Sequence, residues 1–148
     1  MTALIRFSRG TGVAGWAVRS YTWSRFAHVG FLLAPGIVLD AAPGSGVSVR
    51  EQPALDGDAL FRADVPDAVV DAAVTWARNQ VGARYDYIGV LGLGLHRNWR
   101  DESHWWCSEL VAAAFEHAGH PLLNAKFLSR ISPQDLLLSP YLIPVARV

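Results

Sequence analysis

One short β-hairpin pattern constrains the fold of this chain more than any other feature of its sequence. Two apolar runs, Val29–Leu33 and Ile37–Leu39, flank the turn-forming segment Ala34–Gly36. Side chains on a strand alternate between two faces, so the length of the turn decides which residues share a face. A turn of three residues pairs Gly30 with Asp40.

In that register one face of the hairpin is apolar and the other is polar. The apolar face holds Val29, Phe31, Leu33, Ile37, Leu39 and Ala41. His28 and Asp40 share the other face with Gly30 and Val38. Because glycine has no side chain, Gly30 opposite Asp40 leaves room for the imidazole and the carboxylate to meet diagonally. A turn of two residues would put His28 and Asp40 on opposite faces.

The rest of the chain predicts an α+β fold with an antiparallel sheet and separate helices. Further strands are expected at Ala3–Phe7, Val47–Gln52, Leu60–Val65 and Tyr141–Val145. Helices are expected at Gly12–Tyr21, from Asp64 to Gly82, at Tyr85–Leu95, at Cys107–Ala118 and at Ser132–Leu138. Asp64 is expected to cap its helix, and Gly119 to end the Cys107 helix. Since no repeat or long linker interrupts the chain, residues 1–148 are interpreted as one domain.

Charge and cysteine content exclude several classes of function. The 13 basic and 13 acidic residues balance, which argues against binding of nucleic acid by a strongly basic surface. The same balance removes the usual electrostatic reason to bind an anionic membrane, although hydrophobic contact stays open. The one cysteine, Cys107, excludes an internal disulfide and a Cys-rich metal site.

The sequence also gives expectations about location. The first ten residues lack the pattern of a signal peptide, so the chain is expected to be cytoplasmic at synthesis. Delivery elsewhere by phage lysis or by a secretion machine would leave no trace in the sequence. The longest apolar run, Tyr87–Leu95, is too short to cross a bilayer, so no integral membrane segment is expected.

Cys107 is the first candidate for chemistry because it begins a predicted helix. The unpaired N–H groups and positive dipole end of a helix favour the thiolate, which is the nucleophilic form. The same N–H groups can stabilise an oxyanion. The alternative is that Cys107 is a small buried apolar residue, which its place on the apolar helix face also fits.

His28 and Asp40 are the second candidates. A carboxylate on an imidazole fixes the tautomer and stabilises the charged ring. The alternative is a cross-strand polar pair on a solvated face. Two of the three roles of a catalytic triad would then lie in one hairpin, with the third at the start of a helix.

The other polar residues give weaker signals. His96, His104, His117 and His120 have no spacing that predicts a metal site with Cys107, and none is expected. Glu109 lies in the first turn of a helix, where it complements the dipole. Tyr85 either donates a hydrogen bond in a cleft or packs half-buried.

Five short motifs, in this order, resemble the circularly permuted NlpC/P60 papain-like cysteine hydrolases. They are Phe26–Phe31, Leu39–Ala41, Gly82–Tyr87, Trp106–Val111 and Ser132–Leu136. The YiiX/YebB-like branch is the most similar, and the lecithin:retinol acyltransferase-like enzymes are relatives. The order is the specific part, because ordinary papain-like enzymes have the cysteine before the histidine.

The resemblance implies roles for particular residues. Cys107 matches the nucleophile, His28 the general base and Asp40 the residue that orients the histidine. Tyr85, Trp106 and Ser108 are implied to line the substrate or to assist the oxyanion. The acyltransferase relatives usually have a second histidine where this chain has Asp40, which makes retinoid or phospholipid acyl transfer less expected.

The expected function is therefore hydrolysis of an amide bond through an acyl-enzyme, without a cofactor. Peptides of the peptidoglycan type are the substrate class that the resemblance implies. A thiol acyltransferase or a lipid ester or thioester hydrolase would use the same three residues, and an elongated apolar pocket beside Cys107 would favour it. A non-enzymatic phage-associated or structural module is the remaining alternative.

Overall fold

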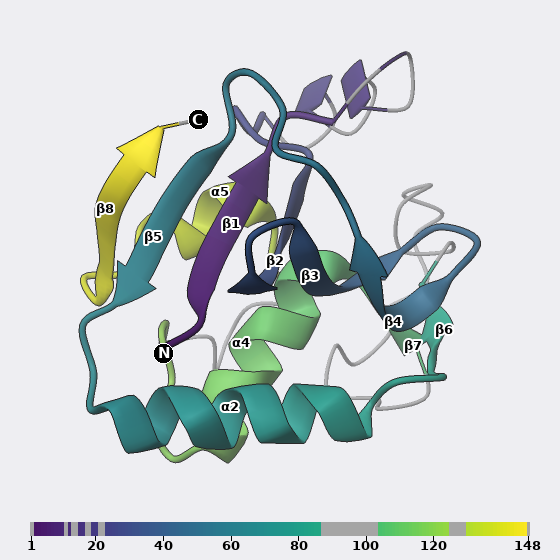
Figure 1. Cartoon of the computed structure of the whole chain (residues 1–148). Helices are drawn as coiled ribbons and strands as arrows, with labels where there is room; N and C mark the ends of the chain where they lie inside the picture. The colour runs from purple at the N-terminus through teal and green to yellow at the C-terminus, as the bar shows by residue number, and fades with distance from the viewer. Residues whose placement is uncertain are drawn as a thin grey trace.

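A six-stranded antiparallel sheet forms the centre of the computed structural model, in the order β4-β3-β2-β1-β5-β8 (Figure 1). The structure describes residues 2–10, 12, 15–16, 19–20, 23–86, 104–124 and 130–147. The strands are β1 (Leu4–Ser8), β2 (His28–Ala34), β3 (Ile37–Ala42), β4 (Gly46–Glu51), β5 (Ala59–Ala63) and β8 (Leu142–Arg147). This arrangement confirms the predicted α+β fold with an antiparallel sheet.

The hairpin β2–β3 keeps the predicted register by a route that the sequence did not predict. Ile37 pairs with Ala34 across a turn of two residues, which corrects the predicted three-residue turn. A bulge between Leu32 and Ala34 then shifts the pairing by one residue. Leu32 pairs with Val38 beyond the bulge, in the predicted register. The shorter turn and the bulge compensate for each other, so the side chains near His28 lie on the predicted faces of the hairpin.

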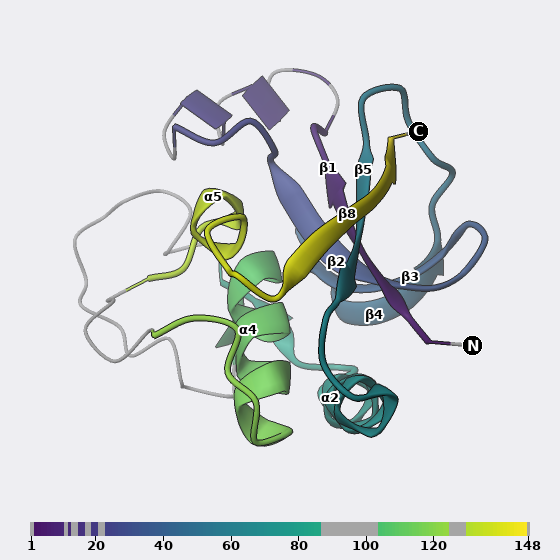
Figure 2. The same cartoon turned by 90° about the vertical axis from the view of Figure 1, so that its left-hand side faces the viewer.

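Two helices cover one face of the sheet (Figure 2). Helix α4 (Cys107–His117) contacts β2 and β3, and α2 (Asp67–Asn79) packs against α4. The buried face of the sheet consists of Ile5, Phe7, Val29, Phe31, Leu39, Ala41 and Val47. Phe31 stacks on Phe115 of α4 with ring centroids 6.0 Å apart. Burial of such side chains contributes roughly 1.5–3 kcal/mol each, and it holds α4 against the hairpin.

Two further contacts fix the segment before α4. Strand β6 (Arg84–Tyr85) pairs in parallel with β7 (His104–Trp105), which leads directly into the helix. The backbone of Ala83 accepts a hydrogen bond from Val47 of β4 at 2.9 Å. A Cβ atom at Gly46 would lie 2.2 Å from the Ala83 carbonyl oxygen, so only glycine permits this approach.

Other boundaries differ from the prediction in ways that have local causes. Pro66, not Asp64, is the N-cap of α2, and no side chain caps it. Asp64 instead pairs with Arg62 at 2.9 Å. Tyr85 lies in a strand rather than at the start of a helix, and residues 87–95 of that predicted helix lie outside the described part. Within Gly12–Tyr21, the described residues are helical.

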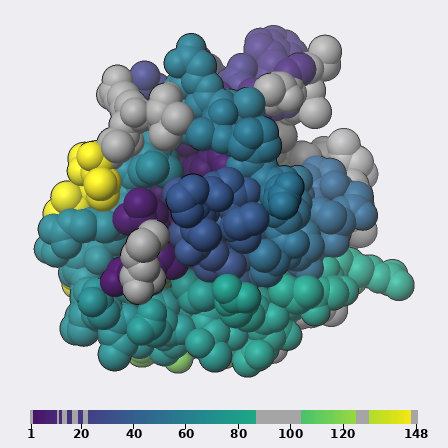
Figure 3. Space-filling view, in the orientation of Figure 1, coloured from purple at the N-terminus to yellow at the C-terminus, as the bar shows by residue number. Residues whose placement is uncertain are grey.

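The last predicted elements are present. Helix α5 (Pro133–Leu136) begins at Ser132, whose side chain forms a capping box with Asp135. Gly119 follows α4 with a φ of 77°, as predicted for the residue that ends it. Figure 3 shows α2 along the bottom of this face of the molecule and the described residues between β1 and β2 at the upper right. Among the described residues, no helix is long and apolar enough to cross a membrane.

Candidate active site

The structure brings Cys107, His28 and Asp40 together at one end of the hairpin. His28 is the first residue of β2, Asp40 lies on β3, and Cys107 is the first residue of α4. His28 Nε2 lies 2.6 Å from Asp40 Oδ2, within hydrogen-bond distance. The ring also makes a side-chain hydrogen bond with Cys107. Because Asp40 occupies Nε2, Nδ1 is the ring nitrogen that remains for the sulfur.

Gly30 explains how the histidine reaches the carboxylate. A Cβ atom added to Gly30 would lie 2.8 Å from Asp40 Cβ and 2.9 Å from Val38 Cγ1. Both distances are shorter than any ordinary carbon contact. The missing side chain therefore gives Asp40 the space it occupies, which agrees with the diagonal meeting predicted from the sequence.

The charges of the site are strongly coupled. Burial alone would lower the pKa of His28, but Cys107 and Asp40 raise it to about 10 through charge and hydrogen bonding. Asp40 is fully buried. Burial alone would raise the pKa of Asp40, yet hydrogen bonds from His28 and Arg50, with the charges of both, lower it. At neutral pH the site therefore holds an imidazolium between two acidic groups.

Arg50 is a member of this site that sequence reasoning missed. Its Nε and Nη2 donate to the two carboxylate oxygens of Asp40 at 3.0 and 2.8 Å. Such a bidentate pair fixes the plane of the carboxylate. The signal was present in the sequence, because Asp40 pairs with Ser48, and Arg50 is the next residue on the same face of β4. Finding it needed the register of β3 against β4.

The start of α4 has the features of an anion-binding position. Trp106 is its N-cap and provides no side-chain hydrogen bond to the first turn. Since the first N–H groups of a helix have no intrahelical acceptor, they are open to an acceptor from a substrate. Cys107 itself is buried, with 1% of its surface exposed.

The three residues implied to line the site all lie near Cys107. Tyr85 is buried on β6 and pairs with Trp105 in β7. Trp106 is buried, and within the described residues its Nε1–H has no hydrogen-bond partner. The Ser108 hydroxyl donates to the Ile131 carbonyl and so fixes the approach to α5. Their contact with substrate stays a prediction.

A charged cluster lies beside these residues. The guanidinium of Arg130 lies 5.7 Å from the centroid of the Trp106 ring. It pairs with the buried carboxylates of Asp86 at 3.3 Å and Glu109 at 3.7 Å. Glu109 therefore does more than complement the helix dipole, because it joins the first turn of α4 to Arg130.

The remaining histidines are placed elsewhere. His117 stacks on Trp76 at 4.4 Å, and His120 packs edge-on against Tyr141. His104 lies on β7, and His96 lies outside the described residues. No group of three or more His, Cys, Asp or Glu side chains that could hold a metal ion occurs in the described part of the chain.

An apolar cavity of about 530 Å³ lies at the other end of the sheet. Its lining includes Leu4, Leu32 and Leu60 but none of His28, Asp40 and Cys107. This cavity therefore does not lie beside Cys107, where a pocket would favour a lipid substrate.

Of the comparisons with known proteins, the one with solved structures found a protein of similar fold. No family model matches the chain. No curated protein matches it. A solved structure described as the metalloprotein YiiX from Escherichia coli O157:H7, DUF1105, aligns over 100% of this chain and 97% of its own, with a TM-score of 0.75 and 17% identity. The chain thus has a YiiX-like fold.

Proposed function

We propose that this chain is a cysteine hydrolase of the circularly permuted papain-like type, which cleaves an amide bond through an acyl-enzyme. One observation carries the proposal. Cys107, at the start of α4, shares a hydrogen bond with an imidazole whose other nitrogen contacts a buried carboxylate. This is the arrangement that nucleophilic catalysis by a thiol requires.

The charges support a defined sequence of steps. The Cys107 sulfur, after its proton has passed to His28, attacks the carbonyl carbon and forms the S–C bond. The N–H groups at the start of α4 stabilise the oxyanion, and Trp106, whose indole N–H is unpartnered, is our candidate for a second donor. His28 then gives its proton to the leaving amine as the C–N bond breaks. Water, deprotonated by His28, hydrolyses the thioester.

Peptides of the peptidoglycan type are the substrate class we propose, and cleavage needs no cofactor. This choice rests on the resemblance of the five motifs. The apolar cavity gives no support for a lipid substrate, because Cys107 does not line it.

The test combines thiol reactivity with turnover. Wild-type protein, Cys107→Ser and His28→Ala would be incubated with peptidoglycan peptides and with acyl esters, and separately with iodoacetamide at about pH 6. We expect turnover of the peptides by wild type alone. Alkylation of Cys107 should be at least about tenfold faster in wild type than in His28→Ala.

Two results would contradict the proposal. One is full activity of Cys107→Ser on any substrate found. The other is an unreactive thiol in correctly folded wild-type protein. Cleavage of esters but not of peptides would instead assign the site to the lipid or acyl-transfer class.

A further inference from the structure

Trp23 occupies a backbone position that strongly favours glycine. Its φ is 53°, and it is the one described non-glycine residue in the left-handed region. The N–H of Ser24 donates to the Arg19 carbonyl at 3.1 Å, the hydrogen bond that closes a helix end through a left-handed residue. Side chains other than glycine and asparagine are disfavoured there because Cβ crowds the backbone.

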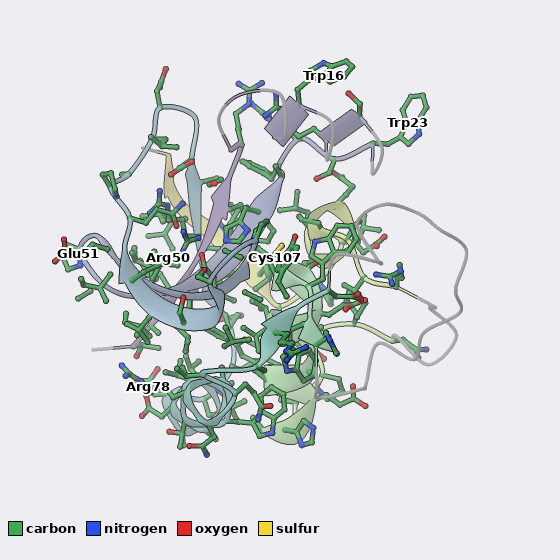
Figure 4. All side chains as sticks on the ribbon, turned by 90° about the vertical axis from the view of Figure 1, so that its right-hand side faces the viewer. Trp16, Trp23, Arg50, Glu51, Arg78 and Cys107 are labelled. Carbon is green, nitrogen blue, oxygen red and sulfur yellow. The ribbon has the colours of Figure 1, made fainter. Side chains whose placement is uncertain are left out.

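The Trp23 indole buries little of its surface against the described residues. The Trp23 side chain is 92% exposed, and Trp16 nearby is 62% exposed. Figure 4 shows both indoles projecting from the same end of the molecule, away from Cys107. A strained residue whose side chain is almost wholly exposed points to a function outside the fold.

The stretch of sequence that carries these two tryptophans is basic. The chain has no acidic residue before Asp40, whereas Arg9, Arg19 and Arg25 lie in this segment. Arg9 and Arg25 are exposed, and the Arg19 side chain donates to the Arg9 carbonyl. Within the described residues none of the three forms an ion pair. The neutral net charge of the whole chain therefore conceals a basic N-terminal stretch of sequence.

The segment is attached firmly to the sheet. Phe26 is buried and lies 5.6 Å from the Phe7 ring, and Ala27 donates to the Ser8 carbonyl at 2.9 Å. The backbone of Phe26 also donates to the Ser24 hydroxyl. The end of the segment that carries Trp23 is thus held in a fixed relation to β1 and β2.

We propose that Trp16, Trp23, Arg9, Arg19 and Arg25 form a docking patch for the surface of an anionic phospholipid bilayer. Indole rings prefer the level of the lipid headgroups, and each nearby arginine adds electrostatic attraction to anionic lipid. Two aromatic side chains with three cations give the two kinds of contact that peripheral binding requires. The proposal does not depend on the chemistry at Cys107.

The experiment is co-sedimentation with lipid vesicles. Purified protein would be mixed with phosphatidylcholine vesicles that contain about 30% phosphatidylglycerol, and with pure phosphatidylcholine vesicles. We expect wild type to pellet with the anionic vesicles, less so at high salt. Trp16→Ala/Trp23→Gly should lower the partition coefficient at least about tenfold. Since glycine suits position 23, Trp23→Gly alone should not lower the melting temperature.

Matched control variants distinguish vesicle binding by this patch from nonspecific adsorption of the protein. Leu138→Ala removes an apolar side chain that is 73% exposed elsewhere, and Arg78→Gln removes an exposed cation far from the two tryptophans (Figure 4). Both variants, and Cys107→Ala, should bind like wild type. Equal pelleting with neutral vesicles, unchanged binding of the double tryptophan variant, or retention on heparin without vesicle binding would each overturn the proposal.

Discussion

Asp40 is the residue on which the geometry of the candidate site depends. It is fully buried, and its two oxygens accept from His28 on one side and from Arg50 on the other. A buried carboxylate without partners would be costly, so each contact stabilises the other. The arginine keeps Asp40 ionised, and the ionised carboxylate orients the imidazole.

Substitution of Arg50 tests this positioning role. In Arg50→Gln, Asp40 loses a bidentate cation, so its pKa should rise and its plane should no longer be fixed. We expect turnover to fall about tenfold to a hundredfold, with the acidic limb of the pH–rate profile moved to higher pH. Arg50→Lys should restore the charge but not the geometry, and should recover part of the activity.

The measurement is a pH profile of turnover and of Cys107 alkylation for the three proteins. Arg62→Gln is the control, because Arg62 pairs with a carboxylate on the surface, away from His28. If the pH profiles of the Arg50→Gln protein coincide with those of wild type, Arg50 has no positioning role in the site.

Among the elements, the hairpin β2–β3 carries the strictest requirement. Gly30 lies where any side chain would collide with Asp40 and Val38. Gly30→Ala should therefore displace Asp40 from His28 and destabilise the fold by roughly 1–3 kcal/mol through overpacking. Urea unfolding and the rate of Cys107 alkylation measure the two effects.

A control in the same hairpin is Gly36→Ala. Gly36 has a φ of 75° but open space around its Cβ position, so alanine there is strained without touching the site. It should lower stability and leave alkylation unchanged. Loss of alkylation in both variants would mean that stability alone explains the result of Gly30→Ala.

At the scale of the whole molecule, the raised pKa of His28 links the site to stability. A group whose pKa is about 10 when folded and about 6.5 when unfolded stabilises the fold fully below pH 6.5. That contribution, at most about 5 kcal/mol, is lost as the pH rises from 6.5 toward 10. The site therefore favours folding more at neutral than at alkaline pH.

Urea unfolding of wild type and His28→Gln across this pH window checks the link. The difference between the two free energies of unfolding should shrink as the pH rises. Parallel curves would show that His28 does not titrate with a raised pKa.

The sequence predicted the parts of this molecule that local rules govern. The facing of His28 and Asp40, the start of α4 at Cys107 and its end before Gly119 all follow from strand alternation and helix capping. Sequence reasoning did not predict contacts between segments that lie far apart in the chain. The pairing of β1 between β2 and β5, the register that brings Arg50 to Asp40, and the parallel pairing of Tyr85 with Trp105 depend on contacts between distant segments. The bulge near Leu32 also escaped prediction, because a turn of two residues plus a bulge has the same facing as a turn of three.

The position of α4 late in the chain has a consequence during synthesis. The hairpin emerges from the ribosome long before the cysteine, and the thiol gains its acid partner only when α4 docks on β2 and β3. A chain that ends before α4 therefore contains His28 and Asp40 but not Cys107. The proposed nucleophile and its imidazole partner therefore meet only when the core is complete.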